Sequence, residues 1–526
     1  MSFYCNGQKG VRNLDLQLII STVFTFEVLF ALVIGVVVAI IIGALPGLSA
    51  SMAVALLIPV TFGMNPVAGL VMLTGVYTAA IYGGSITAIL LHTPGTPSSA
   101  ATAIDGYELT KKGEGFKAIG VATISSVIGG VISALALIFL SPPLAQISLK
   151  FSALEYFFLA LFGLTIIGSL AGDSMAKGLM GGLFGLFLGT IGLDQMNGIP
   201  RFTFGLLPLE SGISMVPAMI GMFSLSQVMI MTEDIFKGKS DTLSISTAES
   251  LLTGRFLPTW KEFKMLIPTI IKSSIIGVFI GILPGAGADI GSWVAYNEAK
   301  RSSKQPETFG KGSIIGIAAS ESANNAVTGG ALIPLITLGI PGSAVAAILL
   351  GGLMIQGLLP GHELFSKHAV VTYSVMFGFL LSNILMGFIG YLFSKQAVKI
   401  TKVSMTILGP IIITLSAVGS YAIQNSIFDV YIMVAFGLIA YFMRKSGFGT
   451  APTILGVILA PMLEANFRRA LVLSKGNLIR YFFSRPIAMT LFMLVVLALF
   501  LPFIVERINK KMSADLNIDN VTNESN

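Results

Sequence analysis

The chain has 526 residues, of which 54% are hydrophobic and only 11% charged, and its formal net charge is +7. Residues 28–104 contain no Asp, Glu, Lys or Arg. A membrane-spanning helix needs roughly 20 apolar residues, so this stretch has room for several spans. The composition excludes a soluble enzyme and a nucleic-acid-binding protein, because no sizeable polar domain remains to carry a basic surface. It predicts a polytopic membrane protein in a lipid bilayer.

Hydrophobic runs between charged or Pro/Gly-rich breaks predict an all-α fold of about twelve spans. The N-terminus lacks the cleavage pattern of a signal peptide, so we expect its first apolar stretch to remain as a helix. The predicted spans lie near 19–43, 66–92, 116–140, 152–170, 176–195, 210–231, 264–283, 312–338, 369–393, 403–423, 427–443 and 487–505. Pieces too short to cross, which we interpret as re-entrant or broken helices, lie near 48–62, 96–104, 286–296, 343–358 and 452–464.

The same Pro/Gly punctuation occurs twice along the chain. The sequence Gly-Ala-Leu-Pro-Gly at 43–47 returns as Gly-Ile-Leu-Pro-Gly at 281–285, and each copy is followed by a second Pro-Gly, at 94–95 and at 341–342. Paired interruptions of this kind in two halves of a membrane protein are typical of transporters with internal repeats. In the first copy the basic loop follows the second Pro-Gly, whereas in the second copy it lies between the two Pro-Gly elements. Because basic loops favour the cytoplasm, equivalent loops lie on opposite faces of the membrane, which favours repeats of inverted topology.

This repeat divides the chain into five parts. We expect an N-terminal segment at 1–18, a first repeat with scaffold helices at 19–231, a polar linker at 232–263, a second repeat with scaffold helices at 264–505 and a polar C-terminal tail at 506–526.

The residues after each second Pro-Gly favour the start of a helix. Thr96 and Ser343 are good N-caps, and Pro97 suits a first helical turn. Such helix starts present free N–H groups to a carboxylate, without needing Lys or Arg. The alternative is that Pro-Gly only kinks a helix or closes a hairpin. The predicted substrate contacts are Gly95, Thr96, Pro97, Ser98, Ser99, Pro341, Gly342, Ser343 and Asn324.

A second polar cluster, residues 320–325, lies between apolar runs. A carboxylate and adjacent amides at membrane depth need partners, either a cation or one another across helices. Oxygen ligands suit a hard cation such as Na⁺. Asp105 is expected to end the first arm with a turn or a cap. The predicted ion-binding residues are Ser49, Asp289, Ser320, Glu321 and Asn325, where Ser49 and Asp289 have capping as an alternative role.

Other motifs narrow the function. No phosphate-binding loop and no histidine pair with metal-ligand spacing occur, so we expect no cofactor, and an ion gradient or another subunit must supply energy. The single cysteine, Cys5, excludes an internal disulfide and a cysteine-based metal site. Glycines from 178 to 192 at four-residue spacing predict close helix packing within the chain, with a homodimer seam as the alternative.

Three stretches, 43–61, 83–113 and 319–352, resemble the large membrane subunit of the tripartite tricarboxylate transporter family. The resemblance runs over roughly 18 to 500, and Glu108 and Leu109 stand where the family commonly has Pro and Met. It implies a multi-pass protein of the bacterial inner membrane that imports organic anions such as citrate with Na⁺ or proton coupling. It also implies two partners, a small four-helix membrane subunit and a periplasmic solute-binding protein.

The sequence therefore predicts a secondary transporter of di- or tricarboxylates, and not an enzyme, since no nucleophile and base pair emerges. Two alternatives stay open. One is an anion channel whose broken helices form a filter, and the other is a carboxylate permease that works without partners.

Overall fold

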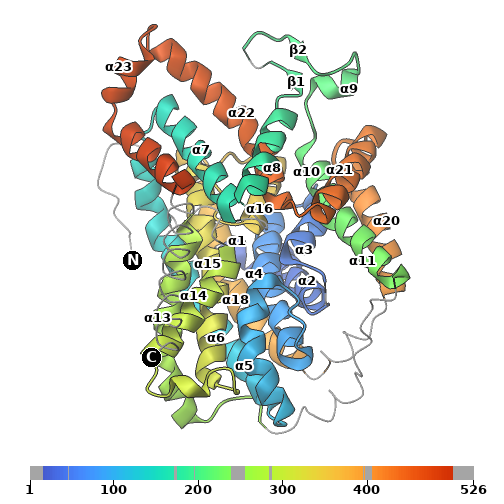
Figure 1. Cartoon of the computed structure of the whole chain (residues 1–526), viewed down its shortest axis with the longest axis vertical. Coiled ribbons are helices and arrows are strands. Elements are labelled where there is room, and N and C mark those ends of the chain that lie inside the picture. The colour runs from blue at the N-terminus through green and yellow to red at the C-terminus, as the bar shows by residue number, and fades with distance from the viewer. Residues whose placement is uncertain are drawn as a thin grey trace, which may run out of the picture.

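A computed structural model describes residues 16–45, 47–170, 175–194, 196–237, 255–283, 287–394, 396 and 405–500 (Figure 1). Most of the predicted N-terminal segment, much of the linker and the C-terminal tail lie outside these residues, as do Cys5, Pro46, Pro284 and Gly285. The regular secondary structure of the described part is helical apart from one small ribbon, in which β1 (Gly192–Leu193) pairs antiparallel with β2 (Pro200–Arg201).

The elements of the first half are α1 (Leu16–Val23), α2 (Phe26–Gly43), α3 (Ala50–Leu57), η1 (Pro59–Thr61), α4 (Pro66–Leu91), η2 (Pro97–Ser99), α5 (Ala100–Lys111), α6 (Gly115–Ser148), α7 (Ala153–Leu170), α8 (Met175–Leu188), α9 (Leu207–Glu210), α10 (Met215–Ile220), the π-helical turn η3 (Gly221–Leu225) and α11 (Ser226–Phe236).

The elements of the second half are α13 (Trp260–Ile282), α14 (Gly287–Ser302), η4 (Pro306–Thr308), α15 (Ile314–Leu338), α16 (Ala344–Ile355), α17 (His362–Ser366), α18 (Ala369–Ser394), α20 (Met405–Gln424), α21 (Ile427–Lys445), α22 (Thr450–Leu473) and α23 (Leu478–Phe483).

In the part of the chain that the structure describes, nine helices are long and apolar enough to cross a membrane. This confirms a polytopic helical membrane protein, with fewer such helices than the twelve predicted. The span expected at 176–195 forms a shorter apolar helix, and the described part of the span expected at 487–505 is the apolar helix Pro486–Phe500. Helix α15 has 25 residues and is long enough to cross, but its polar cluster makes it too hydrophilic to count among the nine. The prediction of a short piece at 452–464 is wrong, because α22 has 24 residues.

The centre of the molecule is built from α4 and α15. Helix α4 packs against α2 and α18, while α15 packs against α13 and α6. The whole apolar stretch by which α4 qualifies as a membrane span is buried inside the protein, so other helices surround this helix. Two outer groups flank the centre, one made of α7, α8 and α22 and the other of α10, α11, α20 and α21 (Figure 1).

The two copies of the repeated motif make the same close contact at equivalent positions. A Cβ atom added at Gly43 would lie 2.3 Å from the carbonyl oxygen of Ala80, and one added at Gly281 would lie 2.6 Å from that of Val327. Only glycine lets the backbones approach this closely. The first helix of each copy is therefore held against the central helix of the same copy.

The glycines of α8 pack within this chain, as predicted. A Cβ atom at Gly185 would lie 1.9 Å from the carbonyl oxygen of Thr453, and one at Gly456 would lie 2.4 Å from that of Gly182. Helix α8 and helix α22 therefore meet backbone to backbone, and this stripe is used by an internal contact.

Candidate transport site

A cavity of about 290 Å³ lies where the broken helices of the two halves converge. Four helices begin at its wall, namely α3, the continuous η2 and α5, α14 and α16. The residues that line it are Ser49, Ala50, Ser51, Tyr77, Ile81, Thr96, Pro97, Ser98, Phe223, Gly287, Ala288, Asp289, Ile290, Ser343, Ala344, Val345, Arg444 and Ala451.

The first half contributes two helix starts to this cavity. Ser49 is the N-cap of α3, and its hydroxyl accepts a 3.2 Å hydrogen bond from the N–H of Met52. Thr96 has the extended backbone of an N-cap before η2, but its hydroxyl contacts those of Ser98 and Ser99, at 3.0 and 2.8 Å, and makes no capping bond. The expected cap is therefore present at Ser49 and is replaced at Thr96 by a cluster of hydroxyls.

The second half contributes the other two helix starts. Ser343 caps α16 by accepting a 3.1 Å hydrogen bond from the N–H of Ala346, as its sequence position predicts. Its hydroxyl also lies 2.8 Å from the hydroxyl of Tyr77 on α4. Asp289 lies in the first turn of α14, and its exposed side chain lines the cavity.

The convergence of helix starts gives the cavity a positive potential. The first N–H groups of a helix have no partner within the helix, and its N-terminus carries about half a positive charge. Such ends bind carboxylates and phosphates. The hydroxyls of Thr96, Ser98 and Tyr77 add donors along the same wall. The cavity is therefore suited to a small anion.

Arg444 is the residue of this site that the sequence analysis missed. It lies in the last turn of α21, lines the cavity, and donates a hydrogen bond from Nη1 to Oε1 of Gln227 on α11. The cavity lined by the predicted arms therefore includes an arginine, which the expectation of an anion site without Lys or Arg did not foresee. Arginines commonly follow membrane spans at the lipid–water interface. The sequence therefore held no signal that distinguishes Arg444 from such an interfacial arginine.

Gly95 and Gly342 lie beside the cavity and are not among the described residues that line it. A Cβ atom at Gly95 would lie 2.2 Å from the carbonyl oxygen of Gly43, and one at Gly342 would lie 2.2 Å from that of Gly281. Both glycines let the start of an arm rest against the end of a helix. Pro341 is buried next to Gly342.

The polar cluster of α15 lies apart from the cavity lining, buried among three helices. Glu321 accepts hydrogen bonds from Thr102 on α5, at 2.5 Å, and from Ser126 on α6, at 2.9 Å. The hydroxyl of Ser320 lies 2.8 Å from that of Thr102. Asn324, the predicted substrate ligand, is fully buried beside Glu321. These side chains tie the first arm to the central helix of the second half.

Asn325 faces the other central helix. Its Nδ2 donates to Oγ1 of Thr78 on α4 over 2.9 Å, and Thr78 in turn donates to Oδ1 of Asn383 on α18 over 2.7 Å. Thr78 and Asn325 precede Gly95 and Gly342 by the same number of residues, so they are equivalent in the two copies. The predicted ion ligands are thereby divided, because Ser49 and Asp289 line the cavity while Ser320, Glu321 and Asn325 are buried in contacts between helices.

The prediction that Asp105 ends the first arm is wrong, because α5 continues to Lys111. Its carboxylate instead binds the loop that leads into α15, whose N-cap is Ser313. Oδ1 of Asp105 accepts hydrogen bonds of 2.8 to 2.9 Å from the N–H groups of Gly310, Gly312 and Ser313, directly before α15. This carboxylate fastens the first arm to the second half of the chain.

Among the described residues no group of three or more His, Cys, Asp or Glu side chains gathers to hold a metal ion. A helix-lined cavity between two similar halves of a polytopic protein defines a membrane transporter rather than an enzyme. The chain belongs to the tripartite tricarboxylate transporter TctA family, whose sequence model matches residues 29–455. This confirms the resemblance found in the sequence.

Two relatives come from Agrobacterium vitis. One is described as an uncharacterized 52.8 kDa protein in the TAR-I ttuC' 3' region, and is 36% identical over 458 residues, which cover 87% of this chain and 89% of that protein. The other is described as an uncharacterized protein in the TAR-II ttuC' 3' region, and is 35% identical over 215 residues, which cover 41% of this chain and 88% of that protein. No solved structure matches the chain.

Proposed function

We propose that this chain is the membrane permease of a tripartite secondary transporter that imports di- or tricarboxylates across the bacterial inner membrane. The observation that carries the proposal is the cavity in which four helix starts meet beside Arg444. Several N–H groups and one guanidinium match the charge and the oxygen atoms of a multiply charged organic anion. The family name supports the same class of substrate.

The repeated contacts support a proposal of alternating access. The two copies carry equivalent glycine contacts, at Gly43 and at Gly281. We infer inverted repeats, in which α2 to α6 correspond to α13 to α18. Movement of the arms with the central helices, against the outer groups of helices, then opens the cavity to one side at a time.

Coupling to a cation is supported by Asp289. A carboxylate in the same cavity as an anionic substrate repels it, unless a cation or a proton neutralises that carboxylate. Ser49 lines the same cavity and offers a second oxygen ligand. We infer that Na⁺, or alternatively H⁺, enters with the substrate, and that Glu321, Ser320 and Asn325 form a second, buried position for it.

Two further subunits complete the proposed system. The family is one of tripartite transporters, so we expect a periplasmic solute-binding protein that delivers the substrate and a small four-helix membrane subunit that assembles with this chain.

The test is counterflow of labelled citrate, and of other di- and tricarboxylates, in proteoliposomes that contain the full chain and its two partners. We expect saturable exchange that responds to a Na⁺ or pH gradient. Exchange that is indifferent to both gradients contradicts the coupling. Conductance far above the turnover of a carrier contradicts the transporter and supports a channel.

A further inference from the structure

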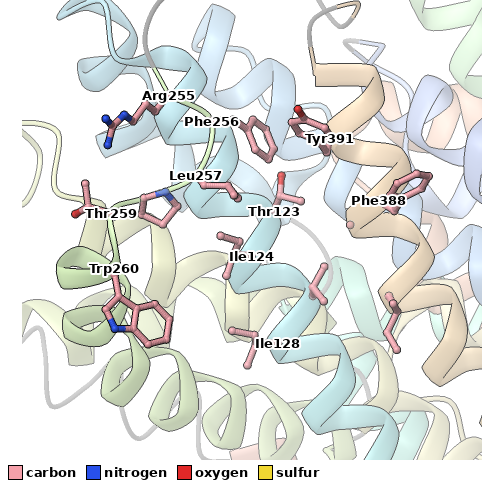
Figure 2. A pocket seen from close by; sticks show the side chains of 14 residues that line it. Thr123, Ile124, Ile128, Arg255, Phe256, Leu257, Thr259, Trp260, Phe388 and Tyr391 are labelled. Carbon is pink, nitrogen blue, oxygen red and sulfur yellow. The ribbon is translucent and has the colours of Figure 1, made fainter.

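A second hollow of about 810 Å³ lies on the outside of the molecule, between α6, α18 and the segment 255–259 that leads into α13 (Figure 2). Its floor and walls are mainly apolar, with Ile124 and Ile128 on α6 and Ile384 and Phe388 on α18. Arg255 lies at one end of it. Nothing in the proposed transport cycle uses this hollow, which we call the lipid-facing groove.

The groove has fixed walls. A Cβ atom at Gly120 would lie 1.6 Å from the carbonyl oxygen of Phe256, so the segment before α13 rests directly on the backbone of α6. The ring of Phe256 packs against those of Phe116 and Tyr391, with centroids 5.1 and 5.0 Å apart. Thr259 starts α13 with a complete capping box. Arg255 is therefore held next to an anchored residue.

The surface around the groove is apolar where a soluble protein would be polar. Leu257, Trp260 and Phe388 are 58, 68 and 62% exposed. In a membrane-spanning protein such side chains face acyl chains. The ring of Trp260 also holds the ammonium group of Lys264 5.4 Å from its centre. Tryptophan, tyrosine and basic residues gather where the headgroups of the bilayer begin.

The basic end of the groove lies at the end of the molecule where the basic loops meet. The ammonium group of Lys112 donates to the carbonyl oxygen of Lys311 over 2.5 Å, and Lys117 pairs with Glu262 over 2.5 Å. Short loops rich in Lys and Arg favour the cytoplasmic side. The cytoplasmic leaflet carries anionic lipids that attract such residues. Within the described part of the chain, Arg255 has no ion-pair partner.

We propose that the groove binds one anionic glycerophospholipid of the cytoplasmic leaflet. Its phosphate pairs with the guanidinium of Arg255, and one acyl chain lies along Ile124, Ile128 and Ile384. The groove joins α6 to α18, and these helices contact the two central helices α15 and α4. A lipid bound there therefore stabilises the packing of the helices that hold the arms.

The test uses the purified full chain in detergent, with phosphatidylglycerol and phosphatidylcholine of identical acyl chains as probes. Native mass spectrometry measures binding, and thermal unfolding measures stabilisation. We expect phosphatidylglycerol to bind at least tenfold more tightly. Arg255→Gln removes most of this preference, whereas Arg255→Lys keeps it. The matched control is Arg469→Gln, at an exposed arginine of α22, which leaves it unchanged.

Four results overturn the proposal. One is equal binding of the two lipids to the wild-type chain. Another is an unchanged preference in Arg255→Gln. The third is that Ile384→Trp, which fills the groove, leaves the binding of phosphatidylglycerol as it was. Inorganic phosphate alone should not stabilise the protein, and stabilisation by it equal to that by the lipid also contradicts an acyl-chain site.

Discussion

Gly95 rests against the carbonyl oxygen of Gly43 so closely that a Cβ atom would lie 2.2 Å from that oxygen. Gly342 and Gly281 make the same contact in the second half, with the same distance. In both halves, the glycine that begins the first repeated motif is thus in contact with the glycine of the second Pro-Gly, far away in sequence. This pair of contacts sets the position of the arms whose first residues line the cavity.

The first prediction concerns these glycines. We expect Gly95→Ala and Gly342→Ala each to lower the stability of the protein by about 1–3 kcal/mol, because a backbone must move to admit the methyl group. Transport should fall in both. Thermal unfolding of the purified variants is the measurement. Gly409→Ala is the control, since its Cβ atom would meet a side chain at an ordinary 3.5 Å, and a fall equal to that of Gly95→Ala contradicts the close contact.

Arg444 gives the second prediction. Loss of one charge-assisted hydrogen bond to a carboxylate costs about 1.5–3 kcal/mol, which corresponds to about a tenfold to hundredfold rise in KM. We expect Arg444→Gln to show this rise for uptake in proteoliposomes, and Arg444→Lys to show a smaller one. Arg469→Gln should transport as the wild-type chain does. An unchanged KM in Arg444→Gln removes this residue from the substrate site.

The third prediction tests the role of Asp289. If a cation neutralises this carboxylate during uptake, Asp289→Asn makes the neutralisation unnecessary. We expect the variant to exchange substrate with little dependence on Na⁺ or on the proton gradient, and to lose accumulation against a gradient. The same counterflow assay, run with and without each gradient, measures both. Retention of the full wild-type cation dependence contradicts the assignment.

A fourth prediction concerns pH and the loop between α8 and β2. The pKa of Asp194 is lowered to about 2, first by hydrogen bonds from the N–H groups of Asn197 and Met196 and then by Arg468. Arg468 Nη1 lies 2.7 Å from Oδ2 of Asp194. A lowered pKa stabilises the folded state above the ordinary pKa of about 4, and this stabilisation is lost as the pH falls toward 2.

Asp194→Asn should therefore unfold at a lower temperature than the wild-type chain at pH 7, and the gap should narrow between pH 5 and pH 3. Thermal unfolding of both proteins at pH 7, 5 and 3 measures how the difference in unfolding temperature changes with pH. A gap that widens as the pH falls contradicts the lowered pKa.

Many residues of the cavity wall can be predicted from the sequence, because Pro-Gly and a capping residue mark where a broken helix begins again. Ser49, Thr96 and Ser343 were predicted on that basis, and all three line the cavity. Arg444 could not be found in this way, since it reaches the cavity from a helix outside both arms. Only the packing of α21 against η3 and α11 brings it there.

The length of α22 was missed for a different reason. Glu464 and Arg468 interrupt its apolar run and suggest that the helix ends. In the structure Glu464 pairs with Arg201 over 2.7 Å, and Arg468 pairs with Asp194. Partners from a distant loop therefore allow charged residues inside a long helix, and no local pattern records them.

The central claim is that the cavity between the four helix starts holds the transported anion. Its most direct test is chemical labelling of a cysteine in the cavity wall. Replacing Cys5, the only cysteine of the chain, by serine gives a background in which Ser51→Cys labels the cavity and Ser211→Cys labels an exposed site away from it.

The measurement is the rate of maleimide labelling in Na⁺ buffer, with and without citrate. The same measurement is made with any other carboxylate that the counterflow assay shows to be carried. We predict that the substrate slows labelling of Ser51→Cys about tenfold or more and leaves labelling of Ser211→Cys unchanged. A carried substrate that slows neither, or slows both equally, contradicts the assignment of this cavity as the transport site.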